Sequence, residues 1–503
     1  LPRTRTEHVV LEAWQAVLHR TEIGITDDFF AAGGHSLAAV EVVARLRETL
    51  GTDIPLRVLF EHPTIERMAA WIDAHSAASN AALPIRRLTS GERAPLSFAQ
   101  ERVWLFQKLE SDSATYNVTP IIRLRGPLDR AHLTTAIVQL LERHEALRSI
   151  FVEGDAGPEQ RVEDVPADVL EYHSIRDVPV ASRETQRQQV IRTRNARPFD
   201  LGVEIPFRAL LLEVDADVHD LVLTFHHVAS DYTSVRTFIR ELHTLYAGGA
   251  LRPLPVTYRD YAAWERASWS DDRLNDEVRF WADYLEGAPH VLDFPVDRPR
   301  TAETGYSGEF IEILVPEPAA APLLGLAQQE RVSVFPLLLA VFGAVLHRHT
   351  GQRDLVIGAP ATGRSRSELQ DVVGMFINQI PVRLQVAPAR TLRELVRDAR
   401  TSALAALAHQ DMPFPRLVEL LGGSREAGRT PLFQVMLNVL PAGLDNPLPS
   451  VDGVEFVQPD VREFRSLIDL HSKYDFTLYA MQREGGLHLG LVYNRDLFDH
   501  SRM

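Results

Sequence analysis

Cysteine is absent from this 503-residue sequence. The chain therefore has no disulfide bond, no thiolate metal ligand and no cysteine nucleophile. Any thioester chemistry would have to take its sulfur from a prosthetic group. A chain without disulfides fits a cytoplasmic location, which is the location that we expect.

Long apolar runs are absent as well. No segment approaches the length of a membrane span, and LPRTRTEH at the N-terminus lacks the apolar core of a signal peptide. The net charge of −15 at pH 7 disfavours nonspecific binding of nucleic acid, which depends on Lys and Arg patches. We therefore expect no membrane and no nucleic-acid partner.

Neither LPRTRTEH nor the final DLFDHSRM carries a terminus signal, so we expect both ends to be cuts within a longer chain, the second just before a helix.

The rest of the composition is that of an ordinary globular protein. Hydrophobic residues make up 45% of the chain and charged residues 24%, which excludes a disordered or fibrous class. A chain of this length exceeds what a single hydrophobic core supports. We therefore expect two or three domains.

The stretch HHVASDYTS, residues 226–234, is the strongest candidate for chemistry. It follows LVLTF, an apolar run rich in branched residues that predicts a buried strand. If the strand runs through the pair, one of His226 and His227 faces the protein body and the other faces away, because neighbouring side chains on a strand point to opposite faces. Adjacent histidines on a strand do not converge on one ion, and cysteine is missing, so we expect no metal site.

This stretch allows two interpretations. In the first, one imidazole is a base or hydrogen-bonding group in a cavity, the other packs, and Asp231 is a buried carboxylate that needs an arginine nearby. In the second, which is commoner, the pair is a satisfied core histidine beside a turn aspartate. The stretch alone does not decide between them.

Residues 1–75 predict a small helical unit. VVLEAWQAVL, HSLAAVEVVARLRETLG and PTIERMAAWI each place apolar side chains at helical spacing. Between the first two, Gly33 and Gly34 permit a close approach to the backbone, and Ser36 begins the second helix. Ser36 is either a plain helix cap or an attachment site, since the N–H groups and the dipole at a helix N-terminus favour a phosphate. A hydrolase nucleophile elbow is excluded, because it needs glycine where Ala38 stands.

Residues 76–95 form a predicted linker, rich in Ala, Ser and Pro and without apolar periodicity. At about 3.3–3.6 Å per residue this segment could span at most roughly 66–72 Å, enough for a mobile domain to change docking sites. Its IRRL stretch can instead lie against the next domain.

From residue 96 the chain alternates strand-like and helix-like segments, which predicts an α/β fold. We expect a helix at SFAQERVWLFQKL, a hairpin at ALLLEVDADVHDLVLTF and a helix after the histidine stretch. A second lobe begins near Trp269 with the helices DDRLNDEVRFWADYL and VFPLLLAVFGAVLHRHTG and the strand DLVIGAP. It ends in a hairpin turned by Gly485 and Gly486.

HHVASD and its flanks resemble the active-site motif of the condensation domains of nonribosomal peptide synthetases. Six further segments resemble that family's other signatures in the same order, and DDFFAAGGHSL resembles the motif of its peptidyl carrier proteins. The six segments are SFAQERVWLFQKL (97–109), RHEALR (143–148), YRDYAAW (258–264), VVGMFINQIPVR (372–383), HQDMPFPRLVE (409–419) and RTPLFQVMLNVL (429–440).

The resemblance implies a fold and an organisation. The fold is a small all-α three- or four-helix carrier bundle, residues 1–75, followed after the linker 76–95 by a two-lobed α/β domain of the chloramphenicol acetyltransferase type. The lobes are expected at 96–268 and 269–503, with a tunnel between them that reaches His227 from both faces.

The resemblance also implies a reaction and partners. Ser36 would carry 4′-phosphopantetheine, with Gly34, His35 and Leu37 as the neighbouring residues of the attachment motif. The arm would present the donor thioester to the amine of an acceptor aminoacyl thioester. Peptide bond formation would then involve aminoacyl and peptidyl thioesters, a phosphopantetheinyl transferase, an upstream adenylation domain and downstream adenylation and carrier domains.

The family pattern assigns roles to individual side chains. His227 would orient the attacking amine and take its proton late, while His226 supports it by packing. Asp231 would pair with Arg143, and the loss of one partner of such a buried pair costs about 3–5 kcal/mol. Ser234 and Asn378 are further weak candidates for the catalytic set.

Tyr232 departs from the family, which usually has glycine after the aspartate. We expect Tyr232 to shape or gate the donor side of the tunnel.

Three rival functions remain open. An epimerisation domain shares the histidine and aspartate core, but it normally follows a carrier with aspartate where this chain has His35, and HQDMPF differs from its signature. A heterocyclisation domain has aspartates in place of the histidines. A non-catalytic recruitment platform typically lacks the second histidine, which is His227 here. Without an epimerase between carrier and condensation unit, an L-configured or achiral donor is favoured.

Overall fold

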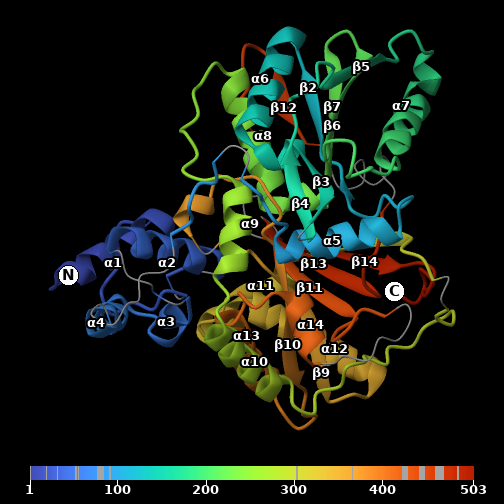
Figure 1. Cartoon of the computed structure of the whole chain (residues 1–503). Coiled ribbons are helices and arrows are strands. Elements are labelled where there is room, and N and C mark those ends of the chain that lie inside the picture. Colours follow the sequence, from blue (N-terminus) through green and yellow to red (C-terminus); the bar gives the residue numbers. More distant parts are fainter. Residues whose placement is uncertain are drawn as a thin grey trace.

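A small helical body and two α/β lobes make up the protein, with the helical body to one side of the lobes (Figure 1). The computed structural model describes the chain except for residues 1, 19, 31, 35, 51–53, 55, 76–83, 90–91, 156, 302–303, 365, 422–428, 441–447, 459–469 and 484–485.

The helical body has four helices: α1 (Arg5–Leu18), α2 (Ser36–Leu50), α3 (Leu56–Glu61) and α4 (Ile65–His75). The predicted apolar faces form its core, where Val10 and Trp14 of α1 meet Phe29 and are completely buried. Trp14 and Phe29 pack edge to face with ring centroids 4.9 Å apart. The predicted carrier bundle is confirmed, with α3 as its short fourth helix.

The second half of the predicted linker lies on the first lobe. Ile85 is buried in that lobe's core, and the backbone N–H of Leu88 donates to Asp260 Oδ1 at 2.7 Å. Residues 76–83 are not described, and eight residues could span at most roughly 26–29 Å at about 3.3–3.6 Å each. The span available to the helical body is therefore much shorter than the whole linker predicts.

The first lobe is built on a six-stranded sheet in the order β12-β2-β7-β6-β5, with β1 paired to β7. The predicted hairpin is β6 and β7, and β7 is buried without interruption from Asp220 to His226. Its strands are β1 (Asn117–Val118), β2 (Ile121–Arg125), β5 (Leu170–Ser174), β6 (Phe207–Asp215) and β7 (Val218–His226), with a separate hairpin of β3 (Ser149–Gly154) and β4 (Gly157–Val162). The helices are α5 (Phe98–Leu109), α6 (Arg130–Arg143), η1 (Glu145–Arg148), α7 (Val180–Asn195), η2 (His227–Ala229), α8 (Tyr232–Tyr246) and α9 (Tyr258–Ala267).

The second lobe has a six-stranded sheet in the order β10-β9-β11-β13-β14-β8. Its predicted final hairpin is β13 and β14, paired antiparallel, although Gly485 lies outside the described residues. The strands are β8 (Gly308–Pro316), β9 (Asp354–Ala361), β10 (Asn378–Gln385), β11 (Val435–Leu440), β13 (Phe476–Arg483) and β14 (Gly486–Asn494). The helices are α10 (Asp271–Leu285), α11 (Glu317–Gln329), α12 (Val334–Thr350), η3 (Ser367–Leu369), α13 (Leu392–Ala408) and α14 (Phe414–Leu421).

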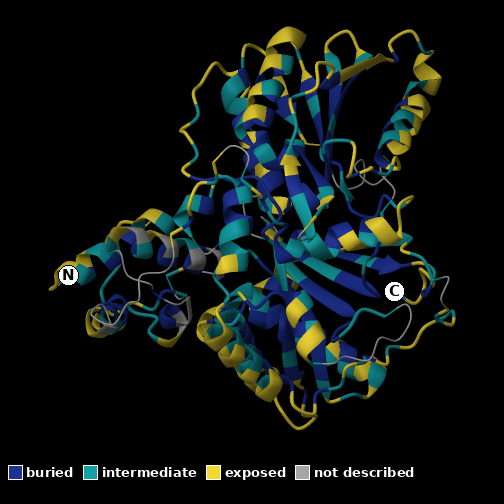
Figure 2. Cartoon of the chain, in the orientation of Figure 1, coloured by how far each residue is buried: buried dark blue, intermediate teal, exposed yellow. Residues whose placement is uncertain are grey.

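Two segments of the second lobe's chain complete the first lobe. Leu369, Val372 and Phe376 lie between β9 and β10 in sequence but are buried in the core of the first lobe. Strand β12 (Glu455–Val457) pairs antiparallel with β2 at the edge of the first sheet. The two lobes are therefore joined by exchanged chain. Figure 2 shows buried residues running through both sheets, while exposed residues gather on the outer helices.

Within the described residues, no single helix is long and apolar enough to cross a membrane. The pair α11 and α12 passes that test only when taken together, and the two helices meet at an angle of 116°.

Candidate active site

His226 is the last residue of β7 and His227 the first of η2, so the strand ends between them, and the two side chains have different surroundings. His226 is 1% exposed, and its Nδ1 accepts a hydrogen bond from the backbone N–H of Val228 at 3.2 Å. Its Nε2 therefore carries the proton and donates to Gln107 Oε1 at 3.3 Å. Burial, followed by the neighbouring His227, holds the pKa of His226 well below its usual value. His226 is thus a neutral, packed histidine.

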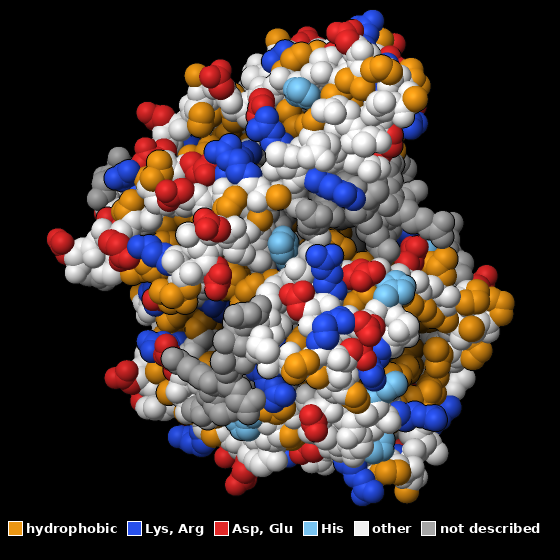
Figure 3. Space-filling view, turned by 90° about the vertical axis from the view of Figure 1, so that its right-hand side faces the viewer, with side chains coloured by type: hydrophobic (Ala, Val, Ile, Leu, Met, Phe, Trp, Pro, Cys, Tyr) orange, Lys and Arg blue, Asp and Glu red, His pale blue; other side chains and the backbone are white. Residues whose placement is uncertain are grey.

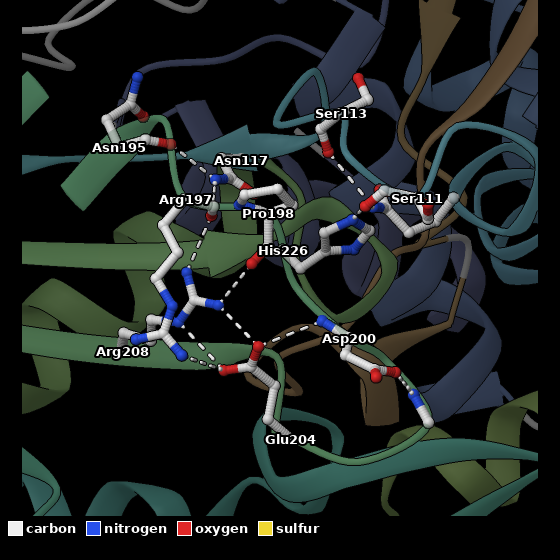
Figure 4. A network of polar contacts seen from close by, with 12 residues as sticks. Ser111, Ser113, Asn117, Asn195, Arg197, Pro198, Asp200, Glu204, Arg208 and His226 are labelled. Atoms are coloured by element: carbon white, nitrogen blue, oxygen red, sulfur yellow. Dashed lines mark hydrogen bonds and ion pairs between the residues drawn. The ribbon is translucent and has the colours of Figure 1, made fainter. Parts of the chain in front are cut away.

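Figure 4 shows His226 beside polar contacts that tie β6, and the β7 neighbour β1, to the loop 195–204. The Arg208 guanidinium donates to the carbonyl oxygens of Arg197 and Pro198 at 2.9 and 2.7 Å and also binds Glu204. The Asn117 amide donates to the carbonyl oxygens of Asn195 and Arg197. These contacts keep the end of β7 rigid, which holds the next residue, His227, in place.

His227 is only half-buried and faces the other way. Its backbone N–H donates to the Tyr116 carbonyl oxygen at 2.8 Å, and the Tyr116 ring packs edge to face on the imidazole at 6.2 Å. Its ring Nδ1 is buried without a hydrogen-bond partner among the described residues, whereas Nε2 is not among the buried unpaired atoms. Nε2 therefore has open space beside it.

The His227 imidazole is held in its neutral form. Burial, and then the positive charge of Lys473, lower its pKa to about 3, against the opposing effect of the backbone carbonyls of His227 and Ser230. A neutral imidazole offers a lone pair as a hydrogen-bond acceptor but is a weak proton acceptor.

Asp231 does not pair with Arg143, so that prediction is wrong. The Asp231 carboxylate caps α8 by accepting from the Ser234 N–H at 2.8 Å, and it accepts from the Phe376 N–H at 3.1 Å. Its arginine is Arg364, whose Nη2 lies 3.3 Å from Asp231 Oδ1 with both side chains buried. Arg143 instead binds Glu241 through Nε and Nη2 at 3.0 and 3.1 Å.

Helix geometry explains this correction. Arg143 ends α6, which packs along α8, whereas Asp231 caps the N-terminus of α8. The partner of Arg143, Glu241, lies ten residues beyond Asp231, which is about 15 Å at 1.5 Å per residue. His144 Nε2 also bonds to Glu241 at 2.7 Å. The RHEALR segment therefore anchors the middle of α8 instead of its first turn.

Ser234 is fully buried, and its hydroxyl lies 2.7 Å from Arg364 Nη2 and 2.7 Å from the Gly374 carbonyl oxygen. The Gly374 N–H donates back to the same hydroxyl at 3.0 Å. These contacts join α8 to Arg364 and Gly374.

Asn378 also has all its polar atoms engaged. Its Nδ2 donates to the carbonyl oxygens of Gln410 and Met412 at 2.8 and 2.7 Å, and its Oδ1 accepts from the Phe414 N–H at 3.1 Å. Asn378 thus fastens the turn before α14 to the start of β10.

Tyr232 begins α8 beside Asp231, and 44% of its surface is exposed. A ring of this size at the first position of the helix has room to contact a ligand, and its gating role stays a prediction.

The carrier motif forms the tight turn that its glycines predict. Gly33 has φ = +102°, and a Cβ on Gly34 would lie 2.3 Å from the Phe29 ring, so both positions require glycine. Helix α2 begins at Ser36, but the side chains of Ser36 and Leu37, and all of His35, lie outside the described residues.

The helical body contacts the second lobe. Helix α3 lies against α13, and α2 lies against η3. Helix η3 belongs to the segment whose Arg364 and Phe376 bond to the Asp231 carboxylate. Leu404 of α13 packs on the helical body's core, and Phe30 lines a small hollow with Phe335 and Leu407. This contact places the carrier motif's helix next to the chain that supports the histidines.

Several residues of the site gave no signal in the sequence. Gln107, Tyr116, Arg364 and Lys473 lie in segments other than the histidine motif. Gln107 sits on the predicted helix 97–109, but periodicity does not show which polar side chain of a helix meets a distant histidine. Among the described residues, no group of His, Asp and Glu is arranged to hold a metal ion.

Family models match both parts of the chain. Residues 91–503 match the condensation domain, and residues 8–72 match the phosphopantetheine attachment site. The first domain therefore carries 4′-phosphopantetheine covalently.

Similar curated proteins are peptide synthetases. The chain is 35% identical over 99% of its length to a linear gramicidin synthase of Brevibacillus parabrevis, of which it covers 10%. It is 36% identical over 97% of its length to phosphinothricin tripeptide synthetase PhsB of Streptomyces viridochromogenes, of which it covers 42%. The chain thus spans less than half of these relatives.

Solved structures show the same fold. The X-domain from teicoplanin biosynthesis matches with a TM-score of 0.73 and 26% identity, covering 83% of this chain and 93% of that one. The four-domain nonribosomal peptide synthetase AB3403 matches with a TM-score of 0.73 and 22% identity, covering 84% of this chain and 32% of that one. The chain belongs to the condensation-domain family of nonribosomal peptide synthetases and bears a phosphopantetheine carrier domain ahead of its condensation domain.

Proposed function

We propose that this chain forms a peptide bond between a donor held on Ser36 and the amine of an acceptor aminoacyl thioester. The single observation that carries the proposal is His227, a neutral imidazole with its Nε2 open, held by a packed His226 behind it. The resemblance to condensation domains supplies the class of reaction.

Ser36 suits the attachment of the arm. The two glycines before it require a tight turn, and the N–H groups at the start of α2 favour the phosphate of the arm. The arm's thiol supplies the activated ester that the reaction needs. With α2 against η3, the donor arrives from the side of the segment 364–377.

The chemistry assigned to His227 is orientation of the amine. We place the ring proton on the buried Nδ1, which leaves the Nε2 lone pair free to accept a hydrogen bond from the acceptor amine. The amine attacks the thioester carbonyl carbon, the C–N bond forms and the C–S bond breaks. The proton lost by nitrogen passes by way of His227 to the departing thiolate.

Holding the two reactants in line contributes more to the rate than proton transfer by His227. A thioester is already activated, and holding two reactants in line contributes up to about 7–11 kcal/mol. Proton transfer by a well-matched base adds about 10²–10⁴-fold, and a base as weak as the His227 imidazole stands at the lower end. His227 therefore acts mainly by orienting the nitrogen.

The test is a single turnover of the full chain. Ser36 is loaded by a phosphopantetheinyl transferase with an aminoacyl arm, a soluble acceptor aminoacyl thioester is added, and the dipeptide is followed by mass. We expect dipeptide from the wild-type chain and none from Ser36→Ala. A wild-type chain that is fully loaded yet forms no dipeptide would refute the proposal.

Two other outcomes of this assay identify the rival functions. A change of stereochemistry at the loaded residue without a new amide bond would assign epimerisation. Recruitment of a partner is the second candidate, because the teicoplanin X-domain, solved in complex with OxyB, matches this chain with a TM-score of 0.71. A loaded chain that neither condenses nor epimerises would favour recruitment.

The arrangement also implies partners. An adenylation domain upstream would load the arm on Ser36, and a downstream carrier would bring the acceptor. Both would belong to the same synthetase.

A further inference from the structure

Lysine is rare in this chain, and its two copies have different surroundings. The sequence holds 53 Lys and Arg residues, of which only Lys108 and Lys473 are lysines. Lys108 is on the surface, with its side chain 51% exposed and its Nζ 2.8 Å from Glu153. Lys473 is half-buried just before β13, in the second lobe.

Lys473 reaches the surroundings of His227 from the opposite lobe. Its Nζ lies 4.0 Å from the centre of the Tyr116 ring. The same ring packs edge to face on the His227 imidazole, and the Tyr116 carbonyl accepts the His227 N–H. Figure 3 shows the surface indented between the lobes, with Lys and Arg side chains on both margins.

The Lys473 ammonium has no counter-charge in the part of the chain that the structure describes. It takes part in no ion pair and no hydrogen bond there, and its Nζ is not among the buried unpaired atoms. Among the described residues, the charged and titratable side chains that interact with it are Arg102 of α5, Tyr116, His226 and His227. None is a carboxylate. The ammonium therefore offers free N–H donors to whatever occupies the space beside His227.

The reaction develops negative charge where a free cation would act. Attack by a neutral amine moves electrons onto the thioester carbonyl oxygen and then onto the departing sulfur. Preorganised donors aimed at such charge are usually the largest single contribution to catalysis of acyl transfer. A nearby cation also disfavours entry of a protonated amine.

We propose that Lys473 is a catalytic residue of the condensation reaction, whose ammonium donates a hydrogen bond to the thioester carbonyl oxygen as negative charge develops there. This inference rests on the proposed function. His227 holds the nitrogen and Lys473 the oxygen, so that each lobe contributes one group and the reaction requires closed lobes.

The charge of Lys473 depends on pH within the physiological range. Burial, and then the positive charge of Arg102, lower the pKa of Lys473 to about 7. The ammonium is therefore present below pH 7 and is lost as the pH rises above it. An arginine at this position would stay charged throughout.

The first test compares single-turnover rates at pH 7 for the loaded chain. We expect Lys473→Met to slow dipeptide formation by about 10²–10³-fold, the usual effect of removing one oxyanion donor. Lys473→Arg should be at least about tenfold faster than Lys473→Met, and Lys108→Met should match the wild type. A Lys473→Met rate within about threefold of the wild type, or equal rates for the Met and Arg variants, would overturn the proposal.

The second test is the pH dependence of the rate ratio between the wild type and Lys473→Arg. The amine's own titration affects both proteins equally and cancels in the ratio. We expect a constant ratio below pH 7 and a fall that approaches about tenfold per pH unit above it. A flat ratio up to pH 9 would show that the charge of Lys473 does not act on the reaction.

The third test needs no reaction and uses the chain without its arm. Trace acetic anhydride is added at a series of pH values, and acetylation of each lysine is measured by peptide mass. We expect Lys473 to reach half its full reactivity near pH 7, well below Lys108. Labelling of Lys108 alone would contradict an open ammonium. If the wild type forms no dipeptide but Lys473 labels as expected, the proposed function fails while the free ammonium stands.

Discussion

Asp231 Oδ1 and Arg364 Nη2 lie 3.3 Å apart in a pair that joins the first lobe to chain from the second. Arg364 also donates to the carbonyl oxygens of Leu369 and Val372 at 2.6 and 2.7 Å, and its guanidinium stacks over the Phe376 ring. The turn after the histidines is therefore held by the other half of the domain.

The first prediction concerns this pair. Arg364→Met should lower the free energy of unfolding by about 3–5 kcal/mol, because it leaves the Asp231 carboxylate buried without its cation. Urea unfolding of the full chain measures the loss.

A double-mutant cycle provides the control. Asp231→Asn and Arg364→Met should couple by about 0.5–3 kcal/mol, whereas Asp231→Asn and Arg143→Met should add within about 0.5 kcal/mol. A larger coupling free energy for Asp231 with Arg143 than with Arg364 would mean that Arg143 is the true partner.

The second prediction concerns His227. Its pKa of about 3 keeps the imidazole neutral over the whole range from pH 5 to pH 8. The loss of rate at low pH should therefore follow protonation of the acceptor amine, and it should move when acceptors of different amine pKa are used. If the loss of rate at low pH has its midpoint near pH 6–7 with every acceptor, the titrating group is His227 and the prediction is wrong.

The effect of removing the His227 ring follows from the same chemistry. His227→Ala should slow single-turnover dipeptide formation by about 10²-fold, at the lower end of the range for proton transfer. Gln107→Ala is the companion variant, because it removes the hydrogen bond to His226 Nε2 and keeps the His227 ring. An unchanged rate in His227→Ala would end the role proposed for this residue.

The third prediction concerns Tyr232. Tyr232→Gly should favour bulky donor side chains over small ones by about tenfold, because a pocket that gains space discriminates by about that much per methylene. Single-turnover rates with donor side chains of increasing size measure this preference. Tyr232→Phe, which keeps the ring, should behave as the wild type, and equal rates for all donors in the glycine variant would refute gating.

The fourth prediction concerns docking of the carrier on α13. Leu404→Glu places a charge in the contact with the helical body and should cut transfer from the Ser36 arm about tenfold or more. Leu392→Glu, at the exposed start of the same helix, is the matched control. A soluble donor thioester should react equally with both variants. If Leu404→Glu transfers normally from Ser36, this contact is not the productive one.

Much of the fold could be predicted because its elements follow local rules. The pattern DDRLNDEVRFWADYL forms α10 over Asp271–Leu285, and the predicted hairpin before the histidines is β6 and β7. Both signals depend on residues within a few positions of one another. The exchange of the segment 364–377 into the first lobe leaves no such local pattern.

The motifs of the sequence, through their resemblance to a known family, determined the class of this protein. The absence of cysteine placed any sulfur on a prosthetic arm, and the order of the motifs indicated a carrier followed by a condensation domain. Only the tertiary structure decided that Arg364 neutralises Asp231 and that Lys473 lies beside the ring shared with His227. The physical reason is distance along the chain: these partners are more than a hundred residues apart, and their meeting depends on how the lobes close.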